Sequence, residues 1–207
     1  MRLHDYAASG NCYKVRLLLA LLGQPYERVP VDIFGGDTLT DAYAALNPVR
    51  ETPVLELDDG TTLTQSGAIL TYLAHGTSWL PAERLAHAQV HQWLAFEQER
   101  VMGGIGAPRF RALTDRPPLE GRLEIGRGAL ALLDDHLAAR PWLVGDGPTI
   151  ADVAVFGYAH VAPEAGLSIP PAVGAWMERI RALPGFVADL APYGENARPG
   201  AGRSIYG

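Results

Sequence analysis

Four consecutive residues near the N-terminus, Ser9-Gly10-Asn11-Cys12, bring together a hydroxyl, an amide and a thiol. They precede an apolar series with the i, i+3, i+4, i+7 spacing of a helix, formed by Val15, Leu18, Leu19 and Leu22. The first turn of a helix carries unpaired N–H groups and a partial positive charge. An anion such as a thiolate is therefore favoured at this helix start, and a neighbouring hydroxyl can donate a hydrogen bond to it.

The same residues also fit purely structural roles. Ser9 and Asn11 are residue types that commonly cap a helix N-terminus. Cys12 is either a nucleophile whose pKa is lowered by the helix start or a small buried apolar residue. The sequence leaves these alternatives open.

Thr52-Pro53 is a second candidate for ligand binding, because Pro53 opens a predicted strand after a loop. Such a position suits a cis peptide bond, although most X–Pro bonds are trans. A cis bond would leave the backbone of Thr52 free to pair with an extended, peptide-like ligand.

Gln65-Ser66 forms a third candidate at the predicted start of another helix. Ser66 is expected to be the N-cap, and the N–H groups that follow it suit a carboxylate. Gln65 is positioned to hold an ammonium or amide group of the same ligand. Simple capping and a solvated turn are the structural alternatives.

Thr149-Ile150-Ala151-Asp152 matches the pattern of a capping box before an apolar run. Thr149 and Asp152 are therefore expected to start a core helix, which is a structural role.

A substrate pocket between the two halves of the chain is a further expectation. Its walls are predicted to include Met102, Arg109, Phe110 and Tyr206, although such residues more often belong to the core or the surface.

The elements that must position these residues divide the chain in two. The first part predicts the order β-α-β-α-β-β-α, with strands at residues 2–6, 26–32, 53–57 and 61–64. After a linker at residues 76–81 the strand signals end, and three helices are predicted around residues 90–101, 125–137 and 150–161. A small α/β domain followed by a helical region is the expected architecture.

Composition narrows the possible functions. The net charge of −6 argues against nucleic acid as a partner. No apolar run reaches the length of about 18 residues that spans a bilayer, and the N-terminus does not match a signal peptide. The single cysteine, Cys12, excludes an internal disulfide, so a cytoplasmic location is expected. The histidines show no HxH or HExxH pair, so no metal site is expected.

The order of these motifs resembles the cytosolic glutathione transferases, in particular bacterial, theta-like and nu-like members. Ser9-Gly10-Asn11 after a strand, Thr52-Pro53-Val54-Leu55, Gln65-Ser66-Gly67-Ala68-Ile69 and the capping box at residues 149–152 carry the resemblance, which extends to about Leu190. It implies a thioredoxin-like domain at residues 1–77, an all-helical domain with an irregular tail at residues 83–207, and a homodimer.

The resemblance also implies roles for individual residues. It places the backbone of Thr52, before a cis Pro53 and followed by Val54, against the cysteinyl unit of glutathione. Gln65 and Ser66 would hold the γ-glutamyl end, and Arg50 and Glu51 would reach the glycyl end. Ser9 would be the catalytic hydroxyl supported by Asn11, with Cys12 as the alternative.

The expected reaction is conjugation of the glutathione thiolate to small apolar electrophiles, as in detoxification, with glutathione as co-substrate and no metal. Two alternatives remain: a glutathione-dependent disulfide-bond reductase or thioltransferase, and a non-catalytic glutathione-binding protein.

Overall fold

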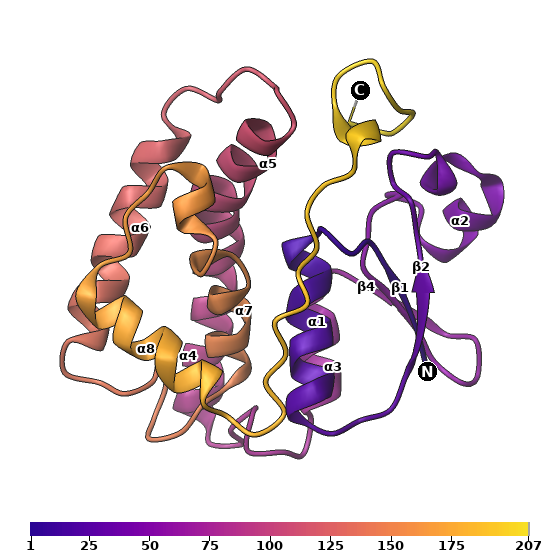
Figure 1. The fold of residues 1–207 in the computed structure, drawn as a ribbon. Helices are drawn as coiled ribbons and strands as arrows, with labels where there is room; N and C mark the ends of the chain where they lie inside the picture. Colours follow the sequence, from indigo (N-terminus) through magenta and orange to yellow (C-terminus); the bar gives the residue numbers. More distant parts are fainter. Residues whose placement is uncertain (207) are drawn as a thin grey trace.

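The computed structural model describes residues 1–206, which form an α/β domain beside a helical domain (Figure 1). The sheet has the strand order β2-β1-β3-β4, in which β1 and β2 are parallel and the other pairs are antiparallel. Its strands are β1 (Arg2–Asp5), β2 (Glu27–Pro30), β3 (Val54–Glu56) and β4 (Thr62–Thr64). The helices of this domain are α1 (Gly10–Leu21), α2 (Asp41–Leu46) and α3 (Ser66–Ala74), with a 3-10 turn, η1 (Asp37–Leu39), before α2.

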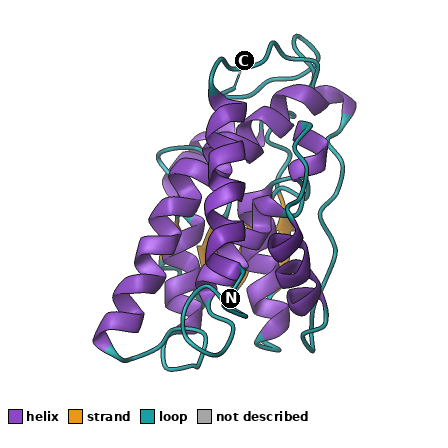
Figure 2. Cartoon of the chain, turned by 90° about the vertical axis from the view of Figure 1, so that its left-hand side faces the viewer, coloured by secondary structure: helices purple, strands orange, loops and turns teal. Residues whose placement is uncertain are grey.

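The second half of the chain is helical, and its helices run side by side in the view of Figure 2. The α-helices are α4 (Arg84–Phe96), α5 (Ala107–Leu113), α6 (Arg122–Leu137), α7 (Ile150–Ala159) and α8 (Pro171–Arg181). A π-helix, η2 (Glu97–Gly106), joins α4 to α5, and two 3-10 turns follow, η3 (Ala162–Ala165) and η4 (Glu195–Ala197). The predicted fold class, a thioredoxin-like domain followed by a helical domain, is confirmed. Within residues 1–206, no helix has the length and apolar character needed to cross a bilayer.

The structure corrects several predicted elements. The helix expected at residues 90–101 begins at Arg84 and changes to π-helix at Glu97. Two helices, α5 and α8, were not predicted. The signal for α8 was present, because its buried residues Val173, Trp176, Met177 and Ile180 follow the spacing i, i+3, i+4, i+7.

The capping box at the start of α7 is confirmed. The Thr149 side chain accepts a hydrogen bond from the backbone N–H of Ala151, and the Asp152 carboxylate accepts one from the backbone N–H of Thr149 at 2.9 Å. Asp152 also accepts hydrogen bonds from the backbone N–H of Leu143 and the indole N–H of Trp176. One buried carboxylate therefore starts α7 and connects it to two other segments of the helical domain.

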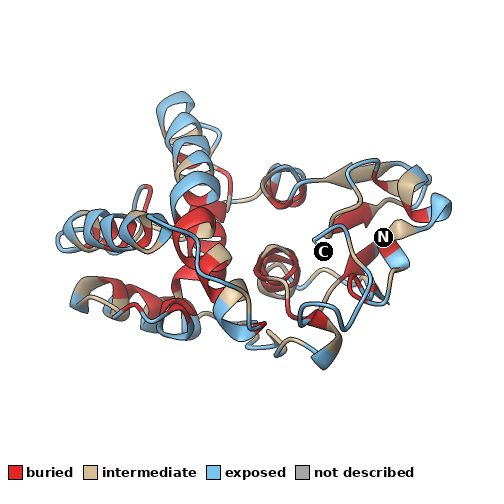
Figure 3. Ribbon diagram, turned by 90° about the horizontal axis from the view of Figure 1, so that it is seen from above, coloured by how far each residue is buried: buried red, intermediate tan, exposed pale blue. Residues whose placement is uncertain are grey.

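The core passes through the contact between the two domains, where α1 packs on α3 and α7. In the view from above, buried positions run through the middle of the molecule (Figure 3). Tyr158 requires glycine at two positions, because a Cβ on Gly10 of the N-terminal domain or on Gly106 of the helical domain would lie 2.4 or 2.6 Å from its ring. Tyr158 on α7 therefore wedges between the start of α1 and the end of η2.

The segment after α8 rises along α1 between the two domains (Figure 1). The Tyr13 hydroxyl donates to the carbonyl of Val187 at 2.7 Å, and the backbone N–H of Ala191 donates to the carbonyl of Ala7 at 3.1 Å. Farther along, the N–H of Arg203 donates to the carbonyl of Phe34. The predicted tail is irregular in conformation, but these hydrogen bonds fix it to the N-terminal domain.

Candidate active site

A cavity of about 350 Å³ lies where the start of α1 faces η2 and α5. The N-terminal domain contributes Ser9, Asn11, Glu51, Thr52 and Gln65 to its wall, and the helical domain and the tail contribute mainly apolar side chains. The structure therefore brings together residues from all three predicted ligand-binding motifs.

Ser9 is the N-cap of α1 and also lines the cavity. Its Oγ accepts a hydrogen bond from the backbone N–H of Cys12 at 3.3 Å. Accepting this bond uses a lone pair and leaves the hydroxyl proton available. Capping and donation to a ligand are therefore compatible roles for one side chain.

Asn11 lines the cavity in the first turn of α1. Its Oδ1 accepts hydrogen bonds from the Lys14 ammonium at 2.8 Å and from the Ser66 hydroxyl at 3.3 Å. Lys14 is completely buried and forms an ion pair with Glu97 of η2, with 2.7 Å between Nζ and Oε1. The sequence analysis missed both charged residues, and the only available signal was a lone lysine inside an apolar helix.

Cys12 points away from the cavity. The side chain is 0% exposed, and the backbone N–H of Tyr6 donates to its Sγ at 3.4 Å. Burial, reinforced by the charge of Asp5, raises the pKa of the Cys12 thiol to about 12. The thiol is therefore neutral near pH 7 and behaves as a small core residue.

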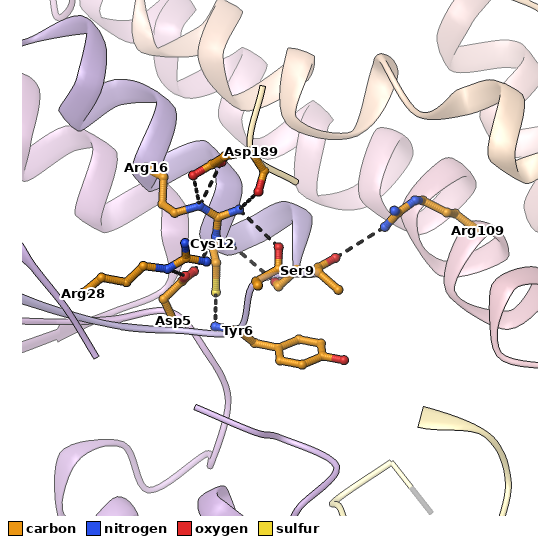
Figure 4. A network of polar contacts seen from close by, with 10 residues as sticks. Asp5, Tyr6, Ser9, Cys12, Arg16, Arg28, Arg109 and Asp189 are labelled. Carbon is orange, nitrogen blue, oxygen red and sulfur yellow. Dashed lines mark hydrogen bonds and ion pairs between the residues drawn. The ribbon is translucent and has the colours of Figure 1, made fainter. Parts of the chain in front are cut away.

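Two buried arginines hold the loop that precedes Ser9 (Figure 4). Arg16 forms ion pairs with Asp5 and Asp189 and donates to the carbonyl of Ala7 at 3.2 Å. Arg109 donates to the next carbonyl, that of Ala8, at 3.4 Å. The loop is thus fixed from both domains.

The role expected for Arg109 as part of the pocket wall is corrected. Its guanidinium forms an ion pair with Glu164 at 2.6 Å and lies behind the wall, with the residue only 2% exposed. A buried guanidinium needs such partners, and the carbonyl of Ala8 and the carboxylate of Glu164 supply them.

The peptide bond between Thr52 and Pro53 is cis, as predicted. Thr52 lines the cavity, and its backbone N–H and carbonyl have no partner among the hydrogen bonds of residues 1–206. Val54 differs from the expectation, because its side chain is 0% exposed and packs in the core beneath the loop. The free backbone of Thr52 is therefore the part of this motif that can pair with a ligand.

Of the two residues before Thr52, only Glu51 lines the cavity. The Arg50 guanidinium instead donates to the carbonyls of Thr38 and Thr40, at 2.8 and 3.0 Å. Arg50 therefore stabilises the turn before α2, which satisfies its charge away from the cavity.

The N-cap of α3 lies one residue earlier than predicted. Gln65, with a φ of 66°, is the N-cap and makes no side-chain capping bond, whereas Ser66 is the first residue of α3. The first backbone bond of α3 joins the N–H of Ile69 to the carbonyl of Gln65. The N–H groups before Ile69 therefore remain free for an anion.

The opposite wall of the cavity is aromatic. It includes the predicted Met102, Phe110 and Tyr206, together with Phe34 and Tyr193, which the sequence analysis missed. The rings of Phe34 and Phe110 stack with centroids 5.9 Å apart and an interplanar angle of 13°. These residues come from four separate segments, the loop between β2 and η1, the π-helix η2, α5 and the tail, so no pattern within one segment predicts that they lie together.

The fold and the site together define a class: a thioredoxin-like α/β domain joined to a helical domain, with a cavity at two helix N-termini where the domains meet. A family model described as "Glutathione S-transferase, N-terminal domain" matches residues 3–78, and one described as "Glutathione S-transferase, C-terminal domain" matches residues 117–179. The expected resemblance is thereby confirmed.

Several individual proteins of the same family are also similar to this chain. Maleylacetoacetate isomerase from Pseudomonas aeruginosa is 32% identical, over 92% of this chain and 91% of that protein. Mouse glutathione S-transferase theta-2 is 29% identical, over 79% of this chain and 73% of that protein. The crystal structure of a glutathione S-transferase from Pseudomonas fluorescens superposes with a TM-score of 0.87 at 43% identity, covering 92% of this chain and 98% of the other. The chain belongs to the glutathione S-transferase family.

Proposed function

We propose that this protein is a glutathione transferase that joins the glutathione thiolate to small apolar electrophiles. The single observation that carries the proposal is Ser9, which caps α1 through its oxygen and keeps its proton available at the cavity. The sulfur of a ligand at this point meets both a hydroxyl donor and the positive end of a helix.

These two contacts are strong enough to ionise the thiol. A free thiol has a pKa of about 8.5, and lowering it by about two units requires roughly 2.7 kcal/mol of preference for the anion. A hydrogen bond from Ser9 to a charged sulfur contributes about 1.5–3 kcal/mol. The helix N-terminus adds about 0.3–1 kcal/mol. No metal or general base is needed for this step.

The remaining contacts orient the tripeptide. The free backbone of Thr52 pairs with the cysteinyl unit in the manner of an added strand. The free N–H groups at the start of α3 receive the γ-glutamyl carboxylate, with Gln65 and Ser66 beside them. The thiol loses its proton to solvent, its electron pair forms the carbon–sulfur bond, and the leaving group departs with the electrons of the broken bond.

The aromatic wall of the cavity, opposite Ser9, favours binding of an apolar and preferably aromatic electrophile. Among the described residues that line the cavity, Glu51 alone carries a formal charge. A carboxylate substrate would find no cation there to replace its hydration. For this reason the activity in the name of the Pseudomonas aeruginosa relative is the less favoured proposal for this chain.

The test combines binding with two assays. Purified protein should bind immobilised glutathione, should lower the pKa of the bound thiol in a thiolate-absorbance titration, and should conjugate chlorodinitrobenzene. Turnover of a glutathione mixed disulfide without conjugation would select a disulfide-bond reductase. Binding with neither activity would select a non-catalytic protein, and no binding would overturn the proposal.

A homodimer and a cytoplasmic location complete the proposal, since dimerisation and a cytoplasmic setting are typical of the family. Light scattering during gel filtration tests the first, and fractionation of the source cells tests the second.

A further inference from the structure

We propose that Lys14 is a positioning residue that fixes the direction of the Asn11 side-chain amide, so that the amide nitrogen donates to the thiolate. This inference rests on the proposed function and assigns a task to a buried ion pair that the chemistry described so far does not use. Lys14 is the only lysine among the 17 lysines and arginines of the chain.

The contact between Lys14 and Asn11 determines the amide orientation. An ammonium group has three donors and no acceptor, so it can bind only the oxygen of an amide. Lys14 Nζ lies 2.8 Å from Asn11 Oδ1, and the Ser66 hydroxyl donates to the same oxygen. Asn11 Nδ2 must then face the other side, and it has no partner among the hydrogen bonds of residues 1–206. Because Asn11 lines the cavity, this free donor is available to a bound sulfur.

Lys14 itself has no room to move. Its side chain is 0% exposed, its ammonium lies 4.7 Å from the centre of the Tyr158 ring, and Glu97 Oε1 holds it at 2.7 Å. Its stem crosses Gly157, where a Cβ would lie 2.4 Å from Lys14 Cγ. The ammonium is therefore held by the helical domain while it orients a residue of the N-terminal domain.

Burying the Lys14–Glu97 ion pair removes both charges from water, and this desolvation opposes folding. Burial lowers the pKa of Lys14 and raises that of Glu97, and their mutual attraction opposes both shifts. A buried ion pair is often no more stable than apolar residues of the same volume, so its benefit lies in specifying one arrangement. Here that arrangement presents a donor to the sulfur. With no ammonium present, the amide can rotate and present its oxygen, which repels a thiolate.

The central test uses the double variant Lys14→Met/Glu97→Gln, which removes both charges and leaves no orphan ion. We expect the pKa of bound glutathione to rise by about one unit, which lowers the conjugation rate about tenfold at a pH below that pKa. Asn11→Ala should give a similar rise. In the Asn11→Ala background, the double variant should add nothing.

Two outcomes would overturn the inference: an unchanged thiol pKa in the folded double variant, or an equal rise in the Asn11→Ala background, which would show a direct charge effect. If the double variant does not fold, Asn11→Asp decides the question with Lys14 intact. Its carboxylate has no donor for the sulfur, so the pKa should rise at least as much as in Asn11→Ala, and an unchanged value refutes the role of Nδ2. A normal thiol pKa in the unmodified protein would instead refute the proposed function.

Discussion

The Oγ of Ser9 lies 3.3 Å from the backbone nitrogen of Cys12 and accepts its hydrogen bond. The two interpretations of Ser9, a helix cap and a donor to a ligand, therefore describe different parts of one hydroxyl. The oxygen caps α1, and the proton is available at the cavity. The same geometry explains why Cys12, one turn farther along, is buried and lies outside the cavity wall.

Ser9→Ala should therefore have two separable effects. Loss of a hydrogen bond to the charged sulfur should raise the pKa of bound glutathione by about one to two units. Loss of the cap should lower the free energy of unfolding by about 1 kcal/mol. Thiolate absorbance measures the first effect, and urea unfolding measures the second.

Ser9→Thr is the matched control, because it retains a hydroxyl in the capping position. We expect it to keep most of the pKa shift and of the stability. Glutathione affinity should be largely unchanged in Ser9→Ala, since Thr52 and the start of α3 hold the rest of the tripeptide. An unaltered thiol pKa in Ser9→Ala would remove this residue from the mechanism.

Gly106→Ala should destabilise the packing of η2 against Tyr158 of α7. The added Cβ would lie 2.6 Å from the Tyr158 ring, so the ring or η2 must shift. Overpacking of this kind costs about 1–3 kcal/mol. Thermal unfolding should show a lower midpoint. Gly128→Ala is the control, because nothing lies within 4 Å of that Cβ and α6 should gain up to about 1 kcal/mol in helix propensity. Equal effects at both glycines would contradict the wedge assigned to Tyr158.

Asp152→Ala should be among the most damaging single substitutions. It leaves the N–H groups of Thr149, Leu143 and Trp176 without their acceptor in the core. Several unsatisfied buried donors together should reduce the free energy of unfolding by about 3–5 kcal/mol. Urea unfolding measures the loss.

Asp134→Ala serves as the comparison for Asp152→Ala. The Asp134 carboxylate accepts hydrogen bonds from the backbone N–H groups of Ala172 and Val173 at the start of α8, in a partly exposed setting. Loss of the Asp134 carboxylate should lower the free energy of unfolding by about 1 kcal/mol. A similar cost for both substitutions would show that the connections made by Asp152 add nothing to its capping.

His160 should make the protein less stable in acid. Burial, together with the charges of Arg109 and Arg181, lowers the pKa of His160 to about 4, despite the Nδ1 contact with the carbonyl of Phe156. The unfolded chain, with a histidine pKa of about 6.5, therefore binds the proton more readily. The free energy of unfolding should decrease as the pH falls from about 6.5 to about 4, by up to about 3 kcal/mol.

His160→Gln removes this titration while keeping a hydrogen-bond donor. The difference in unfolding free energy between the two proteins should depend on pH only in that window. A constant difference from pH 7 to pH 4 would show that His160 titrates normally in the folded state.

The sequence predicts a local feature correctly where the residues that cause it are neighbours in the chain. The spacing of Val15, Leu18 and Leu19 predicted α1, and the capping box predicted the start of α7, because both depend on residues within two turns. The exact start of a helix depends on more than residue type, because the N-cap of α3 is Gln65, one residue before the predicted Ser66. That cap depends on a positive φ at Gln65, and the residue type alone does not predict a positive φ.

Ser9 and Asn11 stand directly before an apolar helical series, so the order of residues is enough to identify them as groups that could stabilise an anion at a helix start. That both face the cavity, that Arg109 lies behind its wall and that Glu97 pairs with Lys14 depend on how distant segments pack. The physical reason is that a buried charge takes the partner that the packing of distant segments supplies. No pattern within a single segment encodes that choice.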